Sequence, residues 1–293
     1  MTERTPVGIV GVGAMGLPMA LRLRDAGLPV RAVDAFAAQV AKAQAAGLSA
    51  DTDPRSLQGC AVTLVMVATG VQVVELLNGP PFAEGAMAGS AVVLISTVGP
   101  HVARRAEKLA AASGVRLLDA PVTGGVVGAE QGTLTLFAAG DRELVDELNP
   151  VLSPIGEVHP VGARVGDGQS FKLVNQLLAA VHMAAAAEAL GFAERLGLDL
   201  ATVLDLLPTG TASSWMLEDR GPRMAIPVAD RPVQTQLSIF VKDSGLVADA
   251  AREVGYRAPL VGVAQRLFTA AADRGWGTQD DSSVIDLYRI DAS

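Results

Sequence analysis

The chain has 293 residues, of which 50% are hydrophobic, 18% charged and 4% aromatic, and its formal net charge is −8. This length predicts about two domains, and this hydrophobicity excludes a disordered chain, because disordered segments have too little apolar surface to bury. The acidic balance argues against a nucleic-acid partner, which requires a basic face, and against binding to an anionic membrane surface.

Short apolar runs alternate with helical patterns in the first half of the chain. The expected strands are Val7–Val12, Pro29–Val33, Ala61–Val67, Ala91–Ile95, Val115–Asp119 and Thr133–Ala139. The expected helices are Ala14–Ala26, Ala37–Ala46 and Pro100–Ser113. This alternation is typical of βαβ units, so it predicts a doubly wound, parallel sheet of the Rossmann type.

The second half changes character after Gly168, because no run there has the period of two that marks a half-buried strand. Helical patterns cover Gln169–Leu196, Leu200–Leu207, Ser214–Arg220, Val241–Val254 and Pro259–Arg274. We therefore predict an α/β domain over residues 1–165, followed by an all-α domain over residues 166–293, with a long helix joining the two.

One stretch, Leu173–Ala193, has the length of a membrane span. It contains Asn175, Gln176, His182 and Glu188, which would be costly in lipid. We predict a helix of a soluble protein with no membrane partner. The first residues show no long apolar core of a signal peptide, which favours a cytoplasmic protein.

Cysteine and histidine give no sign of a metal centre. Cys60 is the single cysteine, so a disulfide framework and a cysteine-based metal cluster are excluded. The histidines are far apart and lack ligand spacing, and we expect no metal site.

The clearest motif is Gly-x-Gly-x-x-Gly. Its residues are Gly11, Val12, Gly13, Ala14, Met15 and Gly16. They follow an expected strand and open an expected helix, which is the context of a dinucleotide-binding turn. In such a turn Gly11 permits the tight bend, Gly13 lets the backbone approach a pyrophosphate, and Gly16 lets the helix pack on the strand. A structural turn without a ligand is the alternative.

Asp34 stands at the end of the second expected strand, at the distance from the glycines where a carboxylate binds an adenosine ribose. A carboxylate there would repel a 2′-phosphate, and Ala35 and Phe36 offer no cation to bind one. The sequence therefore predicts NAD rather than NADP as the cofactor. The alternative is that Asp34 is a solvated turn residue.

Two further groups of residues carry polar chemistry. A glycine turn beside a hydroxyl, over Thr123, Gly124 and Gly125, can form a nest of N–H groups for a carboxylate. Lys172 and Asn175 are three apart on an expected helix and share one face. A desolvated lysine can exchange a proton with a substrate, whereas a solvated lysine near a helix start is the alternative.

These groups, in this order, resemble the β-hydroxyacid dehydrogenases, the family of 3-hydroxyisobutyrate dehydrogenase and tartronate semialdehyde reductase. The resemblance covers nearly the whole chain. Its four blocks are the glycine motif running to Ala20, the segment from Asp119 to Gly125 and on to Leu134, the segment Gly166–Gly168 with Lys172 and Asn175, and Lys242 with Asp243.

The resemblance implies a role for each matched residue. Lys172 matches the catalytic lysine, Asn175 the substrate-binding amide, and Thr123, Gly124 and Gly125 the segment that holds the substrate carboxylate. Thr97 matches a threonine near the nicotinamide, and Lys242 matches a lysine close to the cofactor. It also implies that residues 1–165 bind the dinucleotide, and that residues 166–293 bind substrate and build a homodimer or homotetramer.

Two departures bear on the substrate. The family usually has serine where this chain has Thr123, and a second asparagine where it has Gln176. Several segments of the second domain are similar to the L-threonate dehydrogenase branch of the family, which oxidises a four-carbon sugar acid with NAD. In that branch Asp280 and Asp281 would help to bind a polar substrate, and the alternative is that they lie in a solvated loop.

We therefore predict an oxidoreductase that transfers a hydride between a small β-hydroxyacid, such as L-threonate, and NAD, with Lys172 as general acid or base. The alternatives within the family are 3-hydroxyisobutyrate dehydrogenase and tartronate semialdehyde (2-hydroxy-3-oxopropionate) reductase. An imine reductase and a non-catalytic NAD-binding scaffold are further alternatives, and the presence of Lys172 argues against both.

Overall fold

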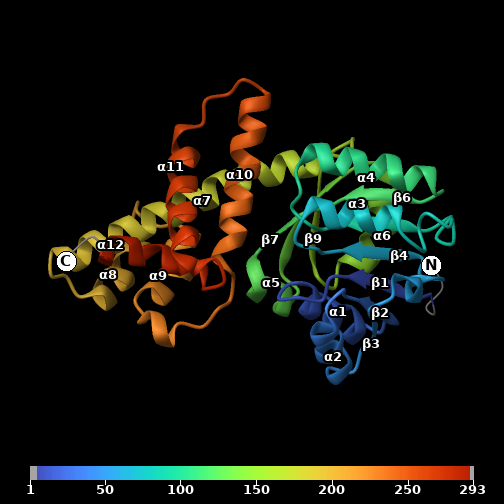
Figure 1. Cartoon of the computed structure of the whole chain (residues 1–293), viewed down its shortest axis with the longest axis horizontal. Coiled ribbons are helices and arrows are strands. Elements are labelled where there is room, and N and C mark those ends of the chain that lie inside the picture. Colours follow the sequence, from blue (N-terminus) through green and yellow to red (C-terminus); the bar gives the residue numbers. More distant parts are fainter. Residues whose placement is uncertain (1–4, 291–293) are drawn as a thin grey trace. The chain divides into compact units, whose positions relative to one another are not determined.

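The structure, a computed structural model, describes residues 5–290. It divides after Lys172 into two compact units, the first a sheet covered by helices and the second helical (Figure 1). Helix α7 (Asp167–Arg195) begins in the first unit and ends in the second. This arrangement confirms the predicted fold class.

The first unit is built on a sheet of nine strands in the order β3-β2-β1-β4-β5-β6-β8-β7, with β9 paired to β8. Its strands are β1 (Val7–Val10), β2 (Val30–Val33), β3 (Ser49–Asp51), β4 (Val62–Val65), β5 (Ala91–Leu94), β6 (Arg116–Asp119), β7 (Val122–Thr123), β8 (Leu134–Ala139) and β9 (Gly156–Gly162). The six from β3 to β6 are all parallel, and their order reverses between β1 and β4. Ligands of such sheets bind beyond the carboxyl ends of the strands at this reversal.

Helices cover both faces of this sheet (Figure 1). They are α1 (Gly16–Asp25), α2 (Ala37–Ala45), α3 (Gly70–Asn78), α4 (Pro100–Ala112), α5 (Gly125–Gln131) and α6 (Arg142–Leu152). Alternate residues of a strand therefore enter separate cores: Leu64 of β4 packs in the core that contains residues of α1, and Val65 in the core that contains residues of α3 and α4. Burial on both sides explains why these strands are continuous apolar runs.

The sheet departs from the parallel prediction at one edge. β8 runs antiparallel to β6 and to β7, although β9 is again parallel to β8. The chain between β6 and β8 contains only the two-residue β7 and the short α5, which is less than the long helical crossover that joins parallel neighbours. The sequence patterns also missed β3, β7 and β9, which are short or partly exposed, and helices α3, α5 and α6.

The second unit contains helices joined by loops, with no strand among its described residues. After α7 come α8 (Leu200–Leu206), α9 (Trp215–Met224), α10 (Leu237–Glu253), α11 (Pro259–Ala271) and α12 (Asp286–Ile290). Short turns of other helix types lie at Leu207–Thr209, Val228–Asp230, Ala272–Trp276 and Asp281–Ile285. Its core includes the rings of Phe240 and Phe268, whose centroids are 5.1 Å apart, and these join α10 to α11.

Helix α7 is, among the described helices, the one long and apolar enough to cross a membrane by length and composition. The core helix of a soluble protein has the same properties. Several of its side chains, such as Met183, Ala187 and Leu190, are buried in the core of the second unit.

Candidate active site

The predicted dinucleotide turn lies between β1 and α1. Two of its glycines are required by the fold itself. Gly11 has a φ of +88°, and a Cβ there would lie 2.2 Å from the carbonyl oxygen of Met66. A Cβ on Gly16 would lie 1.8 Å from the carbonyl oxygen of Gly11, so any side chain would push the helix off the strand.

Gly13 is different, because the protein around it has room for a side chain. A Cβ on Gly13 would meet no atom within 4 Å. Helix α1 begins with no side-chain cap and no acidic residue in its first turn, beside the exposed Ala14 and the half-buried Met15. An open backbone at an uncapped helix start fits the pyrophosphate of a dinucleotide, which such N–H groups bind.

Asp34 lies just beyond β2 and is 8% exposed, which is inconsistent with a solvated turn residue. One carboxylate oxygen accepts the N–H of Val12 in the glycine turn (2.9 Å), and the other accepts the N–H of Phe36 (2.9 Å). Each oxygen keeps a further lone pair for a ribose hydroxyl. The nearby Arg31 donates to the carbonyl oxygens of Ser56 and Gln58.

Lys172 is buried, with 6% of its surface exposed, so the alternative of a solvated lysine is wrong. It is the last residue of the first unit, on α7 and three residues before Asn175. Thr97, also in the first unit, lies between β5 and α4, in a segment held in place by Ser96, whose hydroxyl accepts the N–H of Val67 (2.8 Å).

The predicted carboxylate-binding segment lies where β7 gives way to α5. Thr123 ends β7, and Gly124 and Gly125 have φ values of +120° and +63°. Residues with a side chain rarely adopt a positive φ. Glycine is therefore needed at both positions for the backbone N–H groups to have their present orientation. All three residues are half-buried.

In the second unit, a chain of polar contacts joins α7 to α10. The Asn175 amide donates to Gln176 (2.9 Å), Gln176 donates to a carboxylate oxygen of Asp243 (2.5 Å), and Lys242 pairs with the other oxygen of Asp243 (2.9 Å). Gln176, one of the two departures from the family pattern, is therefore the link between the predicted substrate amide and the lysine predicted to lie near the cofactor.

Asp280 and Asp281 are neither solvated nor free for a substrate. Both are buried, at 1% and 0% exposed. Two guanidinium groups bind them: Arg220 donates twice to Asp281 (3.1 and 3.0 Å), and Arg223 donates to Asp280 (3.0 Å). We call Asp219, Arg220, Arg223, Asp280 and Asp281 the carboxylate cluster. Both interpretations of this pair from the sequence are therefore wrong. The sequence pattern could not show these contacts, because the two arginines lie on α9, some sixty positions away.

The carboxylate cluster contains three carboxylates and two guanidinium groups, so it has one excess negative charge when all are ionised. Burial raises the pKa of Asp281 to about 6, against the opposing charge of Arg220. Burial also opposes ionisation of Asp280, but hydrogen bonds from Ser282 and Gln234 and the charge of Arg223 outweigh it and lower the pKa of Asp280 to about 2. Of these two carboxylates, Asp281 is therefore the one that takes up a proton first as the pH falls, and this protonation removes the excess negative charge.

We therefore expect the stability of the protein to depend on the protonation of Asp281. Because its folded-state pKa is raised, the free energy of unfolding should fall as the pH rises from about 4 to about 6, by up to about 3 kcal/mol. Denaturant unfolding of the wild type and of Asp281→Asn across this range measures the effect. The variant cannot titrate there and should lack this component; equal pH dependence in both proteins would contradict the assignment.

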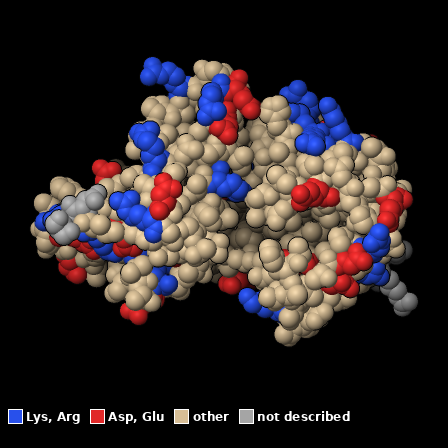
Figure 2. All heavy atoms as spheres, viewed as in Figure 1, with Lys and Arg blue, Asp and Glu red and all other residues tan. Residues whose placement is uncertain are grey.

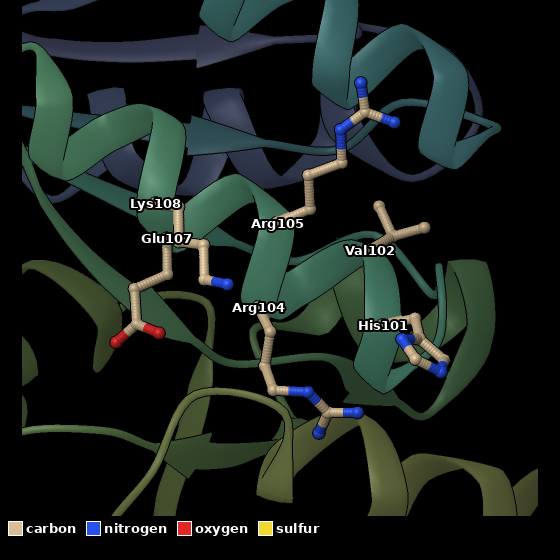
Figure 3. A pocket seen from close by; sticks show the side chains of 6 residues that line it. All are labelled: His101, Val102, Arg104, Arg105, Glu107 and Lys108. Atoms are coloured by element: carbon tan, nitrogen blue, oxygen red, sulfur yellow. The ribbon is translucent and has the colours of Figure 1, made fainter.

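Basic side chains gather over α4 (Figure 2), and residues of this helix line a hollow, which Figure 3 shows from close by. The hollow, of about 500 Å³, is lined by His101, Val102, Arg104, Arg105, Glu107 and Lys108. Arg104 and Arg105 point to different sides of the helix (Figure 3). None of the predicted site residues lines this hollow. Within residues 5–290, no group of three histidine, cysteine or acidic side chains could hold a metal ion.

Two family models together match almost the whole chain and meet at residue 166, a few residues before the point where the structure divides. Residues 6–166 match the model of the NAD binding domain of 6-phosphogluconate dehydrogenase, and residues 166–288 match the model described as NAD-binding of NADP-dependent 3-hydroxyisobutyrate dehydrogenase. The chain belongs to the β-hydroxyacid dehydrogenase family. Membership makes it a hydroxyacid oxidoreductase with a nicotinamide cofactor, as the sequence predicted.

Relatives in this family are similar over almost their full lengths. L-threonate dehydrogenase of Escherichia coli strain K12 is 37% identical, over 96% of this chain and 94% of that protein. 2-Hydroxy-3-oxopropionate reductase of the same strain is 30% identical, over 98% of each chain. The crystal structure of a 3-hydroxyisobutyrate dehydrogenase from Salmonella typhimurium is 36% identical, with a TM-score of 0.88, over 96% of this chain and 99% of that one.

Proposed function

We propose that this β-hydroxyacid dehydrogenase oxidises a small polyhydroxy acid such as L-threonate, with NAD as the hydride acceptor. The observation that carries the proposal is that one unit contains a glycine turn at an uncapped helix start, the buried carboxylate of Asp34 beside that turn, and a buried amine, Lys172. The similarity to L-threonate dehydrogenases supports the choice of acid.

The bound nicotinamide supplies the hydride chemistry, and the residues of this chain supply binding and proton transfer. The backbone at Gly11, Gly13, Ala14, Met15 and Gly16 binds the pyrophosphate, and Asp34 accepts from the ribose diol. Thr97 and Lys242 are assigned to the nicotinamide end of the cofactor.

Substrate binding and proton transfer fall to the remaining residues. The N–H groups and hydroxyl at Thr123, Gly124 and Gly125 donate to the substrate carboxylate. Asn175 binds the reacting hydroxyl, and the neutral Nζ of Lys172 accepts its proton as the hydride leaves the carbon. In the reverse direction the protonated Lys172 returns that proton to the carbonyl oxygen.

Residues 1–165 are then the dinucleotide-binding domain, and residues 166–293 the domain for substrate and oligomerisation. We infer a cytoplasmic homodimer or homotetramer without membrane or nucleic-acid partners. Exposed apolar side chains on α7, namely Val174, Leu178 and Phe192, support association between copies.

A substrate panel tests the proposed function. With NAD, L-threonate should be oxidised faster than 3-hydroxyisobutyrate at equal concentration. A site that binds hydroxyl groups leaves its polar atoms unpaired against an analogue that lacks them, and this costs about 1–3 kcal/mol per group. Asn175 and Gln176 are such polar groups. The same panel should include 2-hydroxy-3-oxopropionate with NADH, and simple alcohols without a carboxylate.

The panel separates the alternatives. If 3-hydroxyisobutyrate is oxidised faster, that acid becomes the assigned substrate in place of L-threonate. If turnover is confined to 2-hydroxy-3-oxopropionate, that compound does. Equal rates with alcohols that lack a carboxylate would remove Thr123, Gly124 and Gly125 from carboxylate binding. NAD binding without turnover of any hydroxyacid would favour a non-catalytic scaffold.

A further inference from the structure

One buried side chain joins three segments that carry the proposed active-site residues. Gln169, in the first turn of α7, is 0% exposed. Its Oε1 accepts the N–H groups of Val98 (2.9 Å) and Gly99 (3.0 Å). Its Nε2 donates to the carbonyl oxygen of Ser96 (3.1 Å) and to the Oδ1 atom of Asp119 (2.9 Å). All four hydrogen-bonding positions of the amide are thereby used.

Asp119, at the end of β6, completes the connection. It is 0% exposed, and its Oδ2 atom accepts the N–H groups of Gly166 (2.9 Å) and Gln169 (3.0 Å) at the start of α7. A carboxylate at a helix N-terminus is stabilised by the helix dipole. The start of α7 lies close to the ends of β6 and β8. A Cβ on Gly168 would lie 2.5 Å from the carbonyl oxygen of Phe137 and 3.0 Å from the Asp119 carboxylate.

The orientation of the Gln169 amide is fixed by its partners. Two backbone N–H groups can only donate, and a carbonyl oxygen and a carboxylate can only accept. Neither the reversed amide nor a carboxylate of the same shape satisfies all four. The interactions therefore require an amide at position 169, and they lie entirely within the first unit.

We propose that Gln169 is a positioning residue of the active site, which sets the cofactor-side segment at Thr97, the substrate segment that begins at Asp119, and the helix turn of Lys172 relative to one another. Thr97 lies within the segment that the Gln169 amide binds at both ends. Asp119 opens the stretch that runs to Thr123, and Lys172 follows Gln169 by one helical turn. This inference rests on the proposed function.

Gln169 reaches no reacting atom in this role, so its effect is on geometry. Displacement of a catalytic group by about 1 Å costs about a hundredfold in rate, even when the substitution is remote from the chemistry. The affinity for NAD should change little, because Gln169 makes no hydrogen bond to the glycine turn or to Asp34, which bind the pyrophosphate and the ribose in the proposed function, and of the proposed cofactor contacts only Thr97 lies in a segment that Gln169 holds.

Two variants test the proposal on the full chain. Gln169→Met keeps the length and removes the hydrogen bonds, and Gln169→Glu keeps the shape but places a carboxylate against Asp119 and the carbonyl of Ser96. The matched control is Ser170→Ala, which removes a hydrogen bond of the same helix turn, from its hydroxyl to the carbonyl of Gly166 (2.8 Å), and leaves the amide in place.

For both Gln169 variants we expect kcat to fall by about a hundredfold, with a dissociation constant for NAD close to that of the wild type. Ser170→Ala should keep the wild-type kcat. Two carboxylates that share a site hold one proton between them, and the introduced acid can donate to Asp119 only while it is protonated. The ratio of the Gln169→Glu rate to the wild-type rate should therefore decrease as the pH rises, whereas the ratio for Gln169→Met should stay level.

Hydrogen exchange gives a readout that does not depend on activity. The N–H groups of Val98 and Gly99 should exchange faster in Gln169→Met than in the wild type or Ser170→Ala. If Gln169→Glu does not fold, Gln169→Met alone decides. A wild-type kcat in folded Gln169→Met, unchanged exchange at Val98 and Gly99, or loss of NAD affinity in parallel with kcat would each overturn the proposal. An inactive wild type would instead refute the proposed function.

Discussion

Lys172→Ala should bind NAD with the affinity of the wild type and lose most of its turnover. A positioned general acid or base typically contributes about 10²–10⁴-fold, so kcat should fall by about that factor. The reason for this expectation is that Lys172 is buried on α7, three residues before Asn175. Burial of an amine costs desolvation free energy, and a catalytic role would account for this cost. Initial rates with the best acid of the substrate panel and titration of NAD measure the two quantities.

The matched control is Lys42→Ala, because Lys42 is an exposed lysine of α2 in the same unit. It should leave kcat unchanged. In the oxidative direction Lys172 has to be neutral to accept the hydroxyl proton, so kcat should rise with pH through the pKa of the enzyme–substrate complex. A near-normal kcat in Lys172→Ala, or a flat profile while hydride transfer limits the rate, would remove Lys172 from the mechanism.

The second large effect concerns the choice between NAD and NADP, which we expect Asp34 to control. A buried carboxylate facing a 2′-phosphate is a like-charge contact, and a few kcal/mol of repulsion corresponds to about a hundredfold in kcat/KM. NAD should therefore be preferred in the wild type, and the double variant Asp34→Ser, Ala35→Arg should lose most of this preference. The kcat/KM ratio for the two cofactors is the measurement.

The structure also determines which substitution is informative here. Asp34→Asn would turn an NH₂ group toward the N–H of Val12 or Phe36, and would disturb the glycine turn as well as the charge. Serine avoids this clash of donors. Asp25→Asn is the control, because Asp25 is an exposed carboxylate at the far end of α1. A wild type that uses NADP better than NAD would show that this reading of Asp34 is wrong.

Local patterns were sufficient for the features that depend on neighbours in the chain. The glycine turn was predictable because a strand, three glycines and a helix follow one another directly. The parallel direction of the strands from β1 to β6 was predictable because a helical crossover returns the chain to the same end of the sheet. Lys172 and Asn175 share a helix face because three residues span nearly one turn. The resemblance to the family added the substrate segment, Thr97 and Lys242.

Strands with few buried residues were less predictable. β3, β7 and β9 are of this kind: β3 and β7 are also short, and β9 is longer but mostly unburied. Their sequences therefore lack the apolar signal that the central strands have. The antiparallel direction of β8 was also undetermined, because a single strand has the same pattern of burial in either direction.

The sequence by itself determined the family, and it predicted the cofactor turn and the residues of the proposed chemistry, since each block of these residues is a pattern within one continuous segment. Only the tertiary structure decided what surrounds them. Gln169 contacts Asp119 and Ser96 across 50 and 73 positions, and Arg220 reaches Asp281 across 61. Whether an amide or a carboxylate is buried, and which partner satisfies it, depends on segments that meet only after folding, so no local pattern contains that information.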